Sequence, residues 1–559
     1  REDRIGVLER INSEGTVLAE LRQNDIKDII KELIAKNPDS VAISLLFSFK
    51  NQVHERMLLE SLRRNMKSYI VASSEVLPEF REFERTSTTV LEAYLGPLVI
   101  GYLKRLNTSI RELCPKSQLA IMQSNGGTML ASQAYGRAIG LAISGLAGGA
   151  IGGWEIARQN KVRRAITLDM GGTSCDISAI LGGVTVRPDN EVGGLPLRVP
   201  SVDVKTIGAG GGSIAWVDDV GILHVGPQSA GAIPGPAAYG KGGDEATVTD
   251  ANLIIGRLNP DYFLGGKIKL HKKRAQTAVS RTASKLGLTM EETALGIIRI
   301  STANMVQAIR EVTIERGADP RNYVLVPFGG AGPTQAVDIA ESLGISQVLV
   351  PPHPGITSAL GLVCTDLRVD LMKTVLMSAT LENQSELISE IHQLNEEAER
   401  RLSEQGVSGE LKVKLDMRYS GQSHELSIDI LCEAGSKDLV RHSIERFEGM
   451  HRDLFGYNMP GLDVEWVTVR AIATGISDAF RPFQHNVTSK ASPIGSRQVL
   501  IAPDSVVEAN IYRRFDLSVG QSVGGPSIIE QLDTTTFVAP GWFAKQTKDG
   551  TLWMRRGEL

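Results

Sequence analysis

The chain has 559 residues, of which 42% are hydrophobic and 22% charged, so it is too long for a single core and too apolar for wholesale disorder. Sixty basic residues against 64 acidic ones give a formal charge of -4, which excludes the basic excess of a nucleic-acid-binding protein. Its four cysteines, Cys114, Cys175, Cys364 and Cys432, form no C-x-x-C pair, which argues against a zinc ribbon or a disulfide framework and for a reduced, cytoplasmic location.

The first part of the chain alternates predicted helices and strands. Apolar residues recur at helical spacing in Asp25–Ala35, Val53–Met66 and Thr88–Leu106, and short β-like runs occupy Val41–Phe47 and Tyr69–Ala72. This alternation indicates an α/β layer architecture.

The middle of the chain carries most of the glycine. The apolar run 138–154 is too short and too rich in Gly and Ala for a membrane span, and we expect a buried loop and helix there. Two apolar strands joined by a glycine turn are predicted within Arg164–Leu181, and 190–249 is rich in Gly and Pro. Helices are predicted at Lys272–Leu286 and Met290–Arg316.

A βαβ unit follows, with strands at Tyr323–Pro327 and Val348–Val350 around a helix at Pro333–Leu343. The composition changes after Leu371, and Leu387–Ser408 is predicted as a highly charged helix. We therefore predict three domains, at residues 1–120, 121–375 and 376–559.

The hairpin ITLDMGGTSCDISAI is the first candidate site. Asp169 ends one predicted strand and Asp176 begins the next, so two carboxylates flank the turn. Glycine N-H groups can converge on phosphate oxygens, hydroxyls add donors, and Mg²⁺ binds through one or two carboxylates plus phosphates and waters. A plain hairpin turn is the alternative. The turn residues are Gly171, Gly172, Thr173 and Ser174.

The second candidate is the glycine turn of VPFGGAGPTQA. It joins a predicted strand to a helix that opens at Pro333, which leaves room for a flat or anionic ligand against the helix N-terminus. Tight strand-to-helix packing is the alternative. The turn residues are Gly329, Gly330, Ala331 and Gly332.

A DxGG hairpin followed by an FGGAG turn resembles the second half of the actin-like ATPases. The segments SSEVLPEFREFERTSTTVLEAYL, QSNGG, DMGGTSCD, IGAGGGSIAWVD, VGPQSAGAIPGPAAYG, FGGAGP and PPHPGITSALG resemble the hydantoinase A and 5-oxoprolinase family. The likeness covers essentially the whole chain. It implies a two-lobed, actin-like ATPase fold of the α/β class with an additional C-terminal α+β domain.

The resemblance implies an ATP-dependent hydrolase that phosphorylates the oxygen of a cyclic amide or imide, with a hydantoinase B-type partner subunit and an oligomeric assembly. ATP and Mg²⁺ are the implied cofactors. Asp169 and Asp176 would hold the metal, 171–174 the β- and γ-phosphates, and 329–332 the adenosine. GAGGGS, with Gly210 and Gly211, would form a further anion nest.

Four departures from the family pattern qualify these expectations. The usual N-terminal DxGGTxTD hairpin does not precede Arg1, so we expect a truncated or split polypeptide that binds ATP weakly alone and exposes a sheet edge. Cys175 replaces a usual Thr and would remove a hydroxyl near the phosphate. SGLAGG and GPTQA replace SGPAGG and GPLHA.

Other polar residues give weaker signals. A charged cluster at 75–85 either contributes to substrate or interdomain contacts or forms a solvated face. The histidines His224, His353 and His424 lack metal-ligand spacing. A general base remains unassigned among Asp203, Asp218, Asp219 and Asp250.

Two other functions share these motifs. One is an ATP-dependent ketone carboxylase subunit, and the other is a nucleotide-binding scaffold without catalysis. The sequence does not separate them from the cyclic amide hydrolase.

Overall fold

The computed structural model describes residues 3–188, 190–192, 194–430, 438–475 and 483–557. Cys432 lies outside these residues. The chain packs as two compact units: the first comprises 1–144, 187–201 and 365–478, and the second 145–186, 202–364 and 479–559. The three consecutive domains stay a prediction, since the packing interleaves segments from all three. Within the described residues, no helix is long and apolar enough to cross a membrane.

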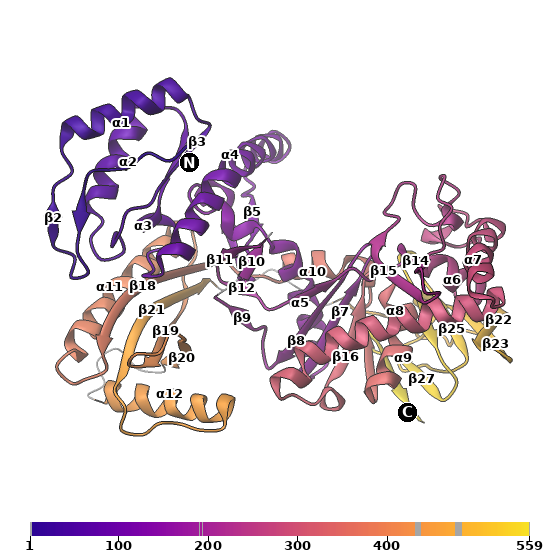
Figure 1. Ribbon diagram of the computed structural model, residues 1–559. Coiled ribbons are helices and arrows are strands. Elements are labelled where there is room, and N and C mark those ends of the chain that lie inside the picture. The colour runs from indigo at the N-terminus through magenta and orange to yellow at the C-terminus, as the bar shows by residue number, and fades with distance from the viewer. Residues whose placement is uncertain (1–2, 189, 193, 431–437, 476–482, 558–559) are drawn as a thin grey trace. The chain divides into compact units, whose positions relative to one another are not determined.

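Unit 1 contains two separate layers of sheet (Figure 1). The parallel pair β3–β4 is covered by α2 on one face, where Ile43 and Ile70 are buried, and by α4 on the other, where Tyr69 is buried. A four-stranded antiparallel sheet in the order β18-β21-β19-β20 packs against α11 and α12 through Trp466 and Phe447. The first elements are β1 (Arg10–Ile11), β2 (Val17–Ala19), α1 (Gln23–Lys36), β3 (Ser40–Ile43), α2 (Val53–Asn65), β4 (Tyr69–Ala72), α3 (Ser73–Val76), α4 (Glu82–Leu113), β5 (Ala120–Met122), β6 (Thr128–Leu130), β10 (Asn190–Val192) and β11 (Leu195–Leu197). The later ones are β18 (Arg368–Ser378), α11 (Gln384–Ser403), β19 (Gly409–Tyr419), β20 (Leu426–Ile430), α12 (Leu439–Phe455) and β21 (Val464–Gly475).

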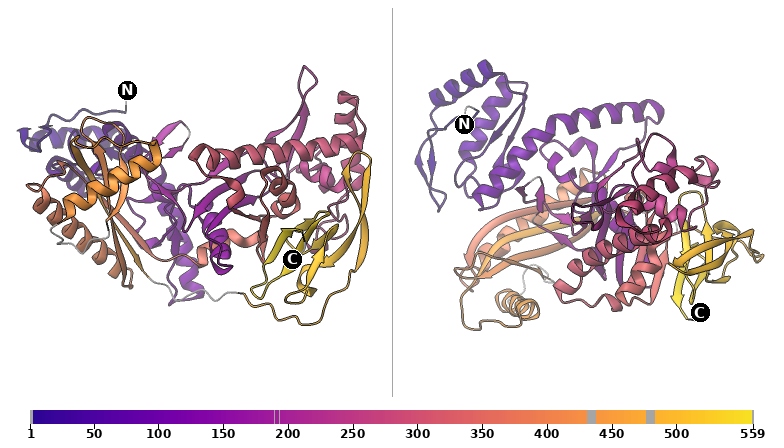
Figure 2. Two further views of the ribbon diagram at one scale, coloured as in Figure 1. Left: turned by 90° about the horizontal axis from the view of Figure 1, so that it is seen from below. Right: turned by 45° about the vertical axis from the view of Figure 1, so that its right-hand side comes forward.

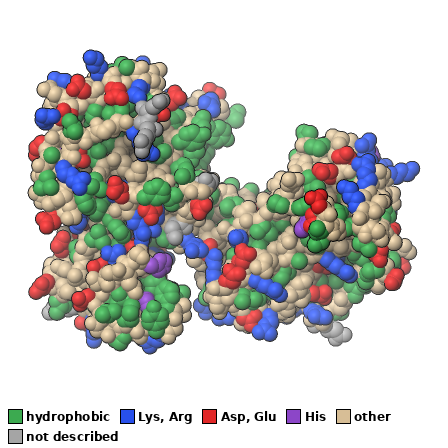
Figure 3. All heavy atoms as spheres, viewed as in Figure 1, with side chains coloured by type: hydrophobic (Ala, Val, Ile, Leu, Met, Phe, Trp, Pro, Cys, Tyr) green, Lys and Arg blue, Asp and Glu red, His purple; other side chains and the backbone are tan. Residues whose placement is uncertain are grey.

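Helix α4 extends beyond the predicted Thr88–Leu106 at both ends, and Pro97 lies inside it. Its Gly96 lies against Tyr69, where a Cβ atom would stand 2.1 Å from the ring. The opposite face exposes large apolar side chains, and Figure 3 shows hydrophobic groups gathered over the end of this helix. These side chains are Phe83, Val90, Tyr94, Leu98 and Tyr102.

Unit 2 is built around an eight-stranded sheet in the order β13-β8-β7-β16-β17-β28-β27-β24. Helices α8 and α9 cover one face, and α5 covers the other through Ile156 and Phe328, as Figures 1 and 2 let the reader follow. The last strands of the chain, β27 and β28, pair antiparallel, and β28 lies beside β17. Thus segments distant in sequence complete one core.

The elements of unit 2 confirm most predicted elements. The βαβ unit is present, with β16 parallel to β17 around α9. The strands are β7 (Arg164–Met170), β8 (Cys175–Leu181), β13 (Lys205–Ile207), β14 (Ser213–Val217), β15 (Leu223–Ser229), β16 (Val324–Phe328), β17 (Gln347–Val350), β22 (Gly495–Ala502), β23 (Ser505–Arg513), β24 (Ser522–Gly524), β25 (Ser527–Glu530), β26 (Thr535–Val538), β27 (Trp542–Gln546) and β28 (Leu552–Arg556). The helices are α5 (Ser144–Gln159), α6 (Val248–Ile254), α7 (Lys272–Leu286), α8 (Met290–Val312), α9 (Gly332–Leu343) and α10 (Thr357–Val363). The two-residue strands β9 (Val186–Arg187) and β12 (Ser201–Val202) lie where the chain leaves and re-enters the unit.

Candidate functional site: a cavity between three glycine turns

The β7–β8 hairpin places its two carboxylates side by side. Asp169 and Asp176 are directly opposite partners in the antiparallel pair, so their side chains leave the same face of the sheet. Ser358 donates to Asp169 Oδ2 at 2.8 Å, and Thr206 of the neighbouring strand β13 donates to Asp176 Oδ1 at 2.7 Å. The carboxylates are thereby held at the end of the strands, beside the turn.

Both carboxyl groups are harder to ionise than usual. Burial raises the pKa of Asp169, the hydrogen bond from Ser358 opposes this, and the charge of Asp176 raises the pKa further. Burial also raises the pKa of Asp176, against the hydrogen bond from Thr206. A cation between the two carboxyl groups would lower both pKa values, because it favours the charged form of each group. Among the described residues, no group of three or more His, Cys, Asp or Glu side chains is arranged so that it could hold a metal ion, so Mg²⁺ here would need oxygens from waters and phosphates.

The turn 171–174 has an open outer side. Gly172 and Thr173 are exposed, and no atom lies within 4 Å of a Cβ built on Gly172. The only backbone bond across the turn runs from Gly171 N to Ser174 O at 3.1 Å. The glycine at 172 is therefore not required by packing, and its lack of a side chain leaves space for a ligand.

The GAGGGS loop supports this turn from beneath. Gly211 N and Gly212 N donate to Gly171 O and Gly172 O at 2.9 and 2.7 Å. A Cβ on the buried Gly210 would stand 2.6 Å from the Gly172 carbonyl, so only glycine allows this backbone contact. The N-H groups of Gly211 and Gly212 therefore already donate to protein carbonyls. The contribution of Gly210 that the structure shows is its close backbone contact with the 171–174 turn.

The β16–α9 turn closes on the same hairpin. Ala331 N donates to Met170 O at 3.0 Å, and Gly329 N donates to Pro354 O at 2.9 Å. Gly329 has φ of 75°, and a Cβ there would lie 2.3 Å from Met170 O. Gly332 is buried at the start of α9. This turn is fixed by packing at Gly329, while Gly330 and Ala331 border open space.

A cavity of about 230 Å³ joins the three turns. This volume is below the roughly 300–1,000 Å³ of typical ligand pockets, so it accommodates part of a nucleotide and leaves the rest outside. Of the predicted site residues, Gly171, Gly172, Gly211, Gly330 and Ala331 line it. Its other lining residues are Tyr239, Thr249, Asn252, Leu258, Tyr262, Phe263, Leu264, Thr334, Gln531, Leu532, Asp533, Thr534 and Thr535.

The remaining predicted site residues surround the cavity without lining it. Asp169, Asp176, Thr173 and Ser174 belong to the hairpin, and Gly210, Gly329 and Gly332 lie behind the turns. None of the four aspartates considered as general bases lines the cavity. Asp250 is fully buried and accepts from Thr247 and from the amides of Ala237 and Ala238, so it is a structural cap of α6.

The C-terminal loop 531–535 contributes a wall that the sequence did not reveal. Thr534 Oγ1 donates to Gly330 O at 2.9 Å, and Thr334 Oγ1 donates to Thr535 O at 2.7 Å. Asp533 Oδ2 accepts from Gly355 N at 2.7 Å. No local motif marks this loop, because its position depends on the pairing of strands distant in sequence.

The expectation for Cys175 is wrong. Its side chain is 0% exposed and packs in the main core with Met170 and Ile177, because it lies on the opposite face of β8 from Asp176. Burial raises the pKa of this thiol well above its usual value. A hydroxyl at this position would face the core, so its loss leaves the open outer side of the turn unchanged.

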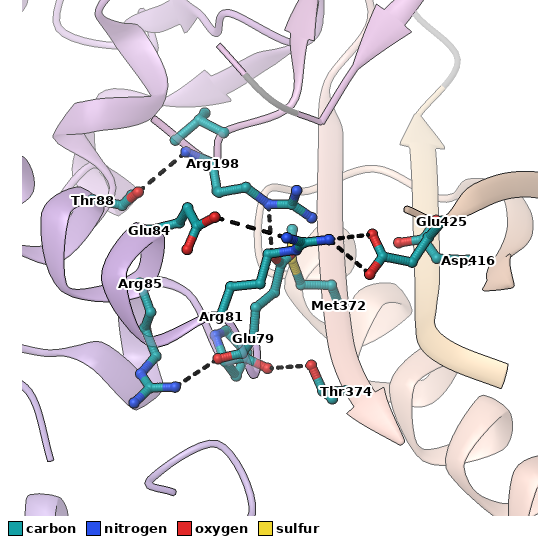
Figure 4. Close-up of polar contacts among 12 residues, drawn as sticks. Glu79, Arg81, Glu84, Arg85, Thr88, Arg198, Met372, Thr374, Asp416 and Glu425 are labelled. Carbon is teal, nitrogen blue, oxygen red and sulfur yellow. Dashed lines mark hydrogen bonds and ion pairs between the residues drawn. The ribbon is translucent and has the colours of Figure 1, made fainter. Parts of the chain in front are cut away.

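The charged cluster 75–85 is also more buried than a solvated face. Glu79 accepts from Arg198 Nε at 2.8 Å and from Arg470 Nη2 at 3.2 Å, and Arg81 pairs with Glu425 at 2.9 Å (Figure 4). Arg85 is 0% exposed and donates to Glu79 O. The network ties the start of α4 to the four-stranded sheet of unit 1. The solvated-face interpretation holds for the exposed Glu75 and Glu82.

Comparison with known proteins first establishes the class. The chain superposes on the crystal structure of the ATP-dependent caprolactamase from Pseudomonas jessenii with a TM-score of 0.88 and 34% identity, covering 99% of this chain and 82% of that one. A nucleotide-free acetone carboxylase structure gives a TM-score of 0.78 at 26% identity, over 99% and 81% of the two chains. The α/β fold of the actin-like ATPases is confirmed.

The sequence comparisons then give the family. The hydantoinase/oxoprolinase model matches residues 85–371, its N-terminal region matches 1–66, and its C-terminal domain matches 377–552. Caprolactamase subunit alpha of Pseudomonas jessenii is 36% identical over 548 residues, which are 95% of this chain and 78% of the relative. The chain belongs to the hydantoinase/oxoprolinase family.

Proposed function

We propose that this chain is the ATP-binding subunit of an enzyme that hydrolyses a cyclic amide. The cavity that joins three glycine turns beside the Asp169–Asp176 pair carries the proposal. The names of the relatives support it, since caprolactamase acts on a lactam and is described as ATP-dependent. Within the site, the open turn 171–174 receives the β- and γ-phosphates, and the 329–332 turn borders the adenosine.

The reaction needs positioning and charge neutralisation. The γ-phosphoryl group passes from ATP to the amide oxygen and leaves ADP, and a first water adds to the activated carbon. The tetrahedral adduct then breaks its C–N bond to leave an acyl phosphate, which a second water hydrolyses to the carboxylate and phosphate. Mg²⁺ supplies neutralisation of the phosphate charge when bound, and Asp169 and Asp176 would hold it. The N-H groups of the first turn orient the phosphates.

A partner subunit and an oligomeric assembly belong to this proposal. Relatives are described as subunits, namely caprolactamase subunit alpha and acetone carboxylase beta subunit. The exposed aromatic and aliphatic face of α4 is of the composition found in protein interfaces. We propose a hydantoinase B-type subunit as the partner.

Ketone carboxylation is the second candidate, because acetone carboxylase shares the fold over nearly the whole chain. Its lower identity, 26% against 34% for the caprolactamase structure, favours the lactam. A scaffold without catalysis would retain the cavity and lack turnover.

The test is phosphate release from ATP and Mg²⁺ by the chain purified with its partner subunit. Caprolactam, 5-oxoproline, a hydantoin and acetone are offered in turn. We expect a cyclic amide to stimulate turnover and Asp169→Asn to reduce it at least about 100-fold, by analogy with loss of one transition-state charge contact. Asp219→Asn is the matched control, because Asp219 is exposed and outside the cavity.

Each other outcome points elsewhere. Stimulation by acetone alone, with bicarbonate present, would replace the lactam by the ketone. Absence of ATP turnover with every substrate, in a folded complex that binds ATP, would support the scaffold. An unchanged rate in Asp169→Asn would remove this carboxylate from the mechanism.

A further inference from the structure

The part of the cavity wall formed by 239–264 has the character of a base-binding surface. Tyr239 and Phe263 have ring centroids 5.7 Å apart, and Tyr262 carries the guanidinium of Arg513 at 3.3 Å from its ring centroid. Leu258 and Leu264 complete this wall. The aromatic rings and aliphatic groups of this wall suit the flat face of a nucleobase.

Apart from the tyrosine hydroxyls, two polar side chains interrupt this wall, Thr249 and Asn252, and Thr249 Oγ1 already donates to Gly211 O at 2.8 Å. Asn252 lies on α6, lines the cavity and is 4% exposed. Its Nδ2 donates to Val248 O at 3.1 Å. A backbone carbonyl can only accept a hydrogen bond, so this bond fixes the orientation of the Asn252 side-chain amide. Oδ1 is then the side-chain atom that can still accept a hydrogen bond. Oδ1 is buried and has no hydrogen-bond partner among the described residues.

The helix holds Asn252 firmly in this arrangement. A capping box between Thr247 and Asp250 fixes the first turn of α6. A buried acceptor without a donor is destabilising, and such groups in folded proteins call for a missing partner. Asn252 lines the cavity, so a ligand bound there is the nearest source of such a partner.

We propose that Asn252 Oδ1 accepts a hydrogen bond from the 6-amino group of adenine, so that this residue selects ATP among purine nucleotides. The inference rests on the proposed function, because it assumes that a nucleotide occupies the cavity. Adenine presents a donor at position 6, whereas guanine presents a carbonyl oxygen there. Guanine would place two acceptors against each other and leave Oδ1 unsatisfied.

The test compares dissociation constants measured by calorimetry on the chain with its partner subunit. The probes are ATP, GTP and purine riboside triphosphate, which lacks only the amino group. We expect ATP to bind about 5- to 10-fold more tightly than purine riboside triphosphate, the value of one hydrogen bond, and GTP to bind most weakly. Equal binding of ATP and purine riboside triphosphate would overturn the inference.

Asn252→Leu removes the acceptor and keeps the number and branching of the side-chain heavy atoms. The preference for ATP over purine riboside triphosphate should fall to about 1, the loss of that one bond. Asn304→Leu is the matched control, because Asn304 also donates to a backbone carbonyl, Val225 O, and lies outside the cavity. A preference that persists in Asn252→Leu would assign the selection to another residue and refute the proposal.

Failure of the proposed function and failure of the role of Asn252 give different results. If no nucleotide binds the wild-type complex, the proposed function fails and this inference fails with it. If ATP binds without discrimination at position 6, only the role of Asn252 is refuted. If Asn252→Leu does not fold, the wild-type comparison of ATP with purine riboside triphosphate still decides.

Discussion

The two glycine turns that flank the cavity look alike in sequence and differ in what their glycines do. Gly172 in the β7–β8 turn has open space where a Cβ would be, and its backbone conformation is one that other residues adopt. Gly329 in the β16–α9 turn has φ of 75° and would clash with Met170 O. One glycine leaves room for a ligand and the other allows two backbone segments to meet. A glycine-rich motif therefore mixes binding and packing requirements.

The largest effect is expected at the packing glycine. Gly329→Ala would place a methyl group 2.3 Å from Met170 O and 2.6 Å from Asp169 Oδ1, in a backbone conformation unfavourable for alanine. We expect the free energy of unfolding to fall by at least about 3 kcal/mol, or the chain to be insoluble. Urea unfolding measures this. A variant with wild-type stability would show that the turn relaxes easily and that Gly329 does not differ from Gly172 in its packing requirement.

A smaller and more selective effect is expected at the open glycine. Gly172→Ala should leave the free energy of unfolding within about 0.5 kcal/mol of wild type, while the added methyl group weakens ATP binding about tenfold or more. The measurements are urea unfolding and calorimetric titration with ATP.

Gly183→Ala is the control for that variant. Gly183 also has no atom within 4 Å of a built Cβ and lies in the turn after β8, away from the cavity lining. Its ATP affinity should equal that of wild type. Equal affinity of Gly172→Ala and Gly183→Ala would mean that the first turn does not face the ligand.

The smallest effect concerns the loop that supports Gly329 through Pro354 O. Burial lowers the pKa of the adjacent His353, with Asp533 opposing and Arg514 adding to the shift. A histidine whose folded pKa is depressed is protonated first in the unfolded chain, so stability is lost as pH falls through about 6.5. Because the ring is half exposed and screened by water, we expect at most about 1 kcal/mol.

His353→Gln should remove this loss, so that a plot of the free energy of unfolding against pH becomes flatter between about pH 5 and pH 8. His424→Gln, at an exposed histidine of unit 1, should leave the curve unchanged. If His353→Gln still loses stability as the pH falls, another group is responsible for that loss. The loop that supports the 329–332 turn would then be insensitive to pH.

Sequence alone predicted the local elements of the fold that surround the cavity. The hairpin with Asp169 and Asp176 and the βαβ unit containing Gly329 follow from short patterns whose cause is local: period-two apolar strands and glycine turns. Asn252 and Asp533 could not be found in this way. Each reaches the cavity through long-range strand pairing and helix packing, which a single sequence does not reveal.

The prediction for Cys175 failed for a related reason. A position-by-position match to the family motif ignores the alternation of the strand, which turns residues 175 and 176 to opposite faces. Likewise, the charges at Glu79 and Arg85 were indistinguishable from a hydrated face until the sheet of unit 1 supplied Arg470 as a partner.

The position of β28 beside β17, and of the 531–535 loop over the second turn, orders events during synthesis. The hairpin and the βαβ unit are translated long before these strands, so the nascent chain carries most of the cavity's lining residues without the wall formed by 531–535. Nucleotide binding can stabilise unit 2 only after the last strands have emerged.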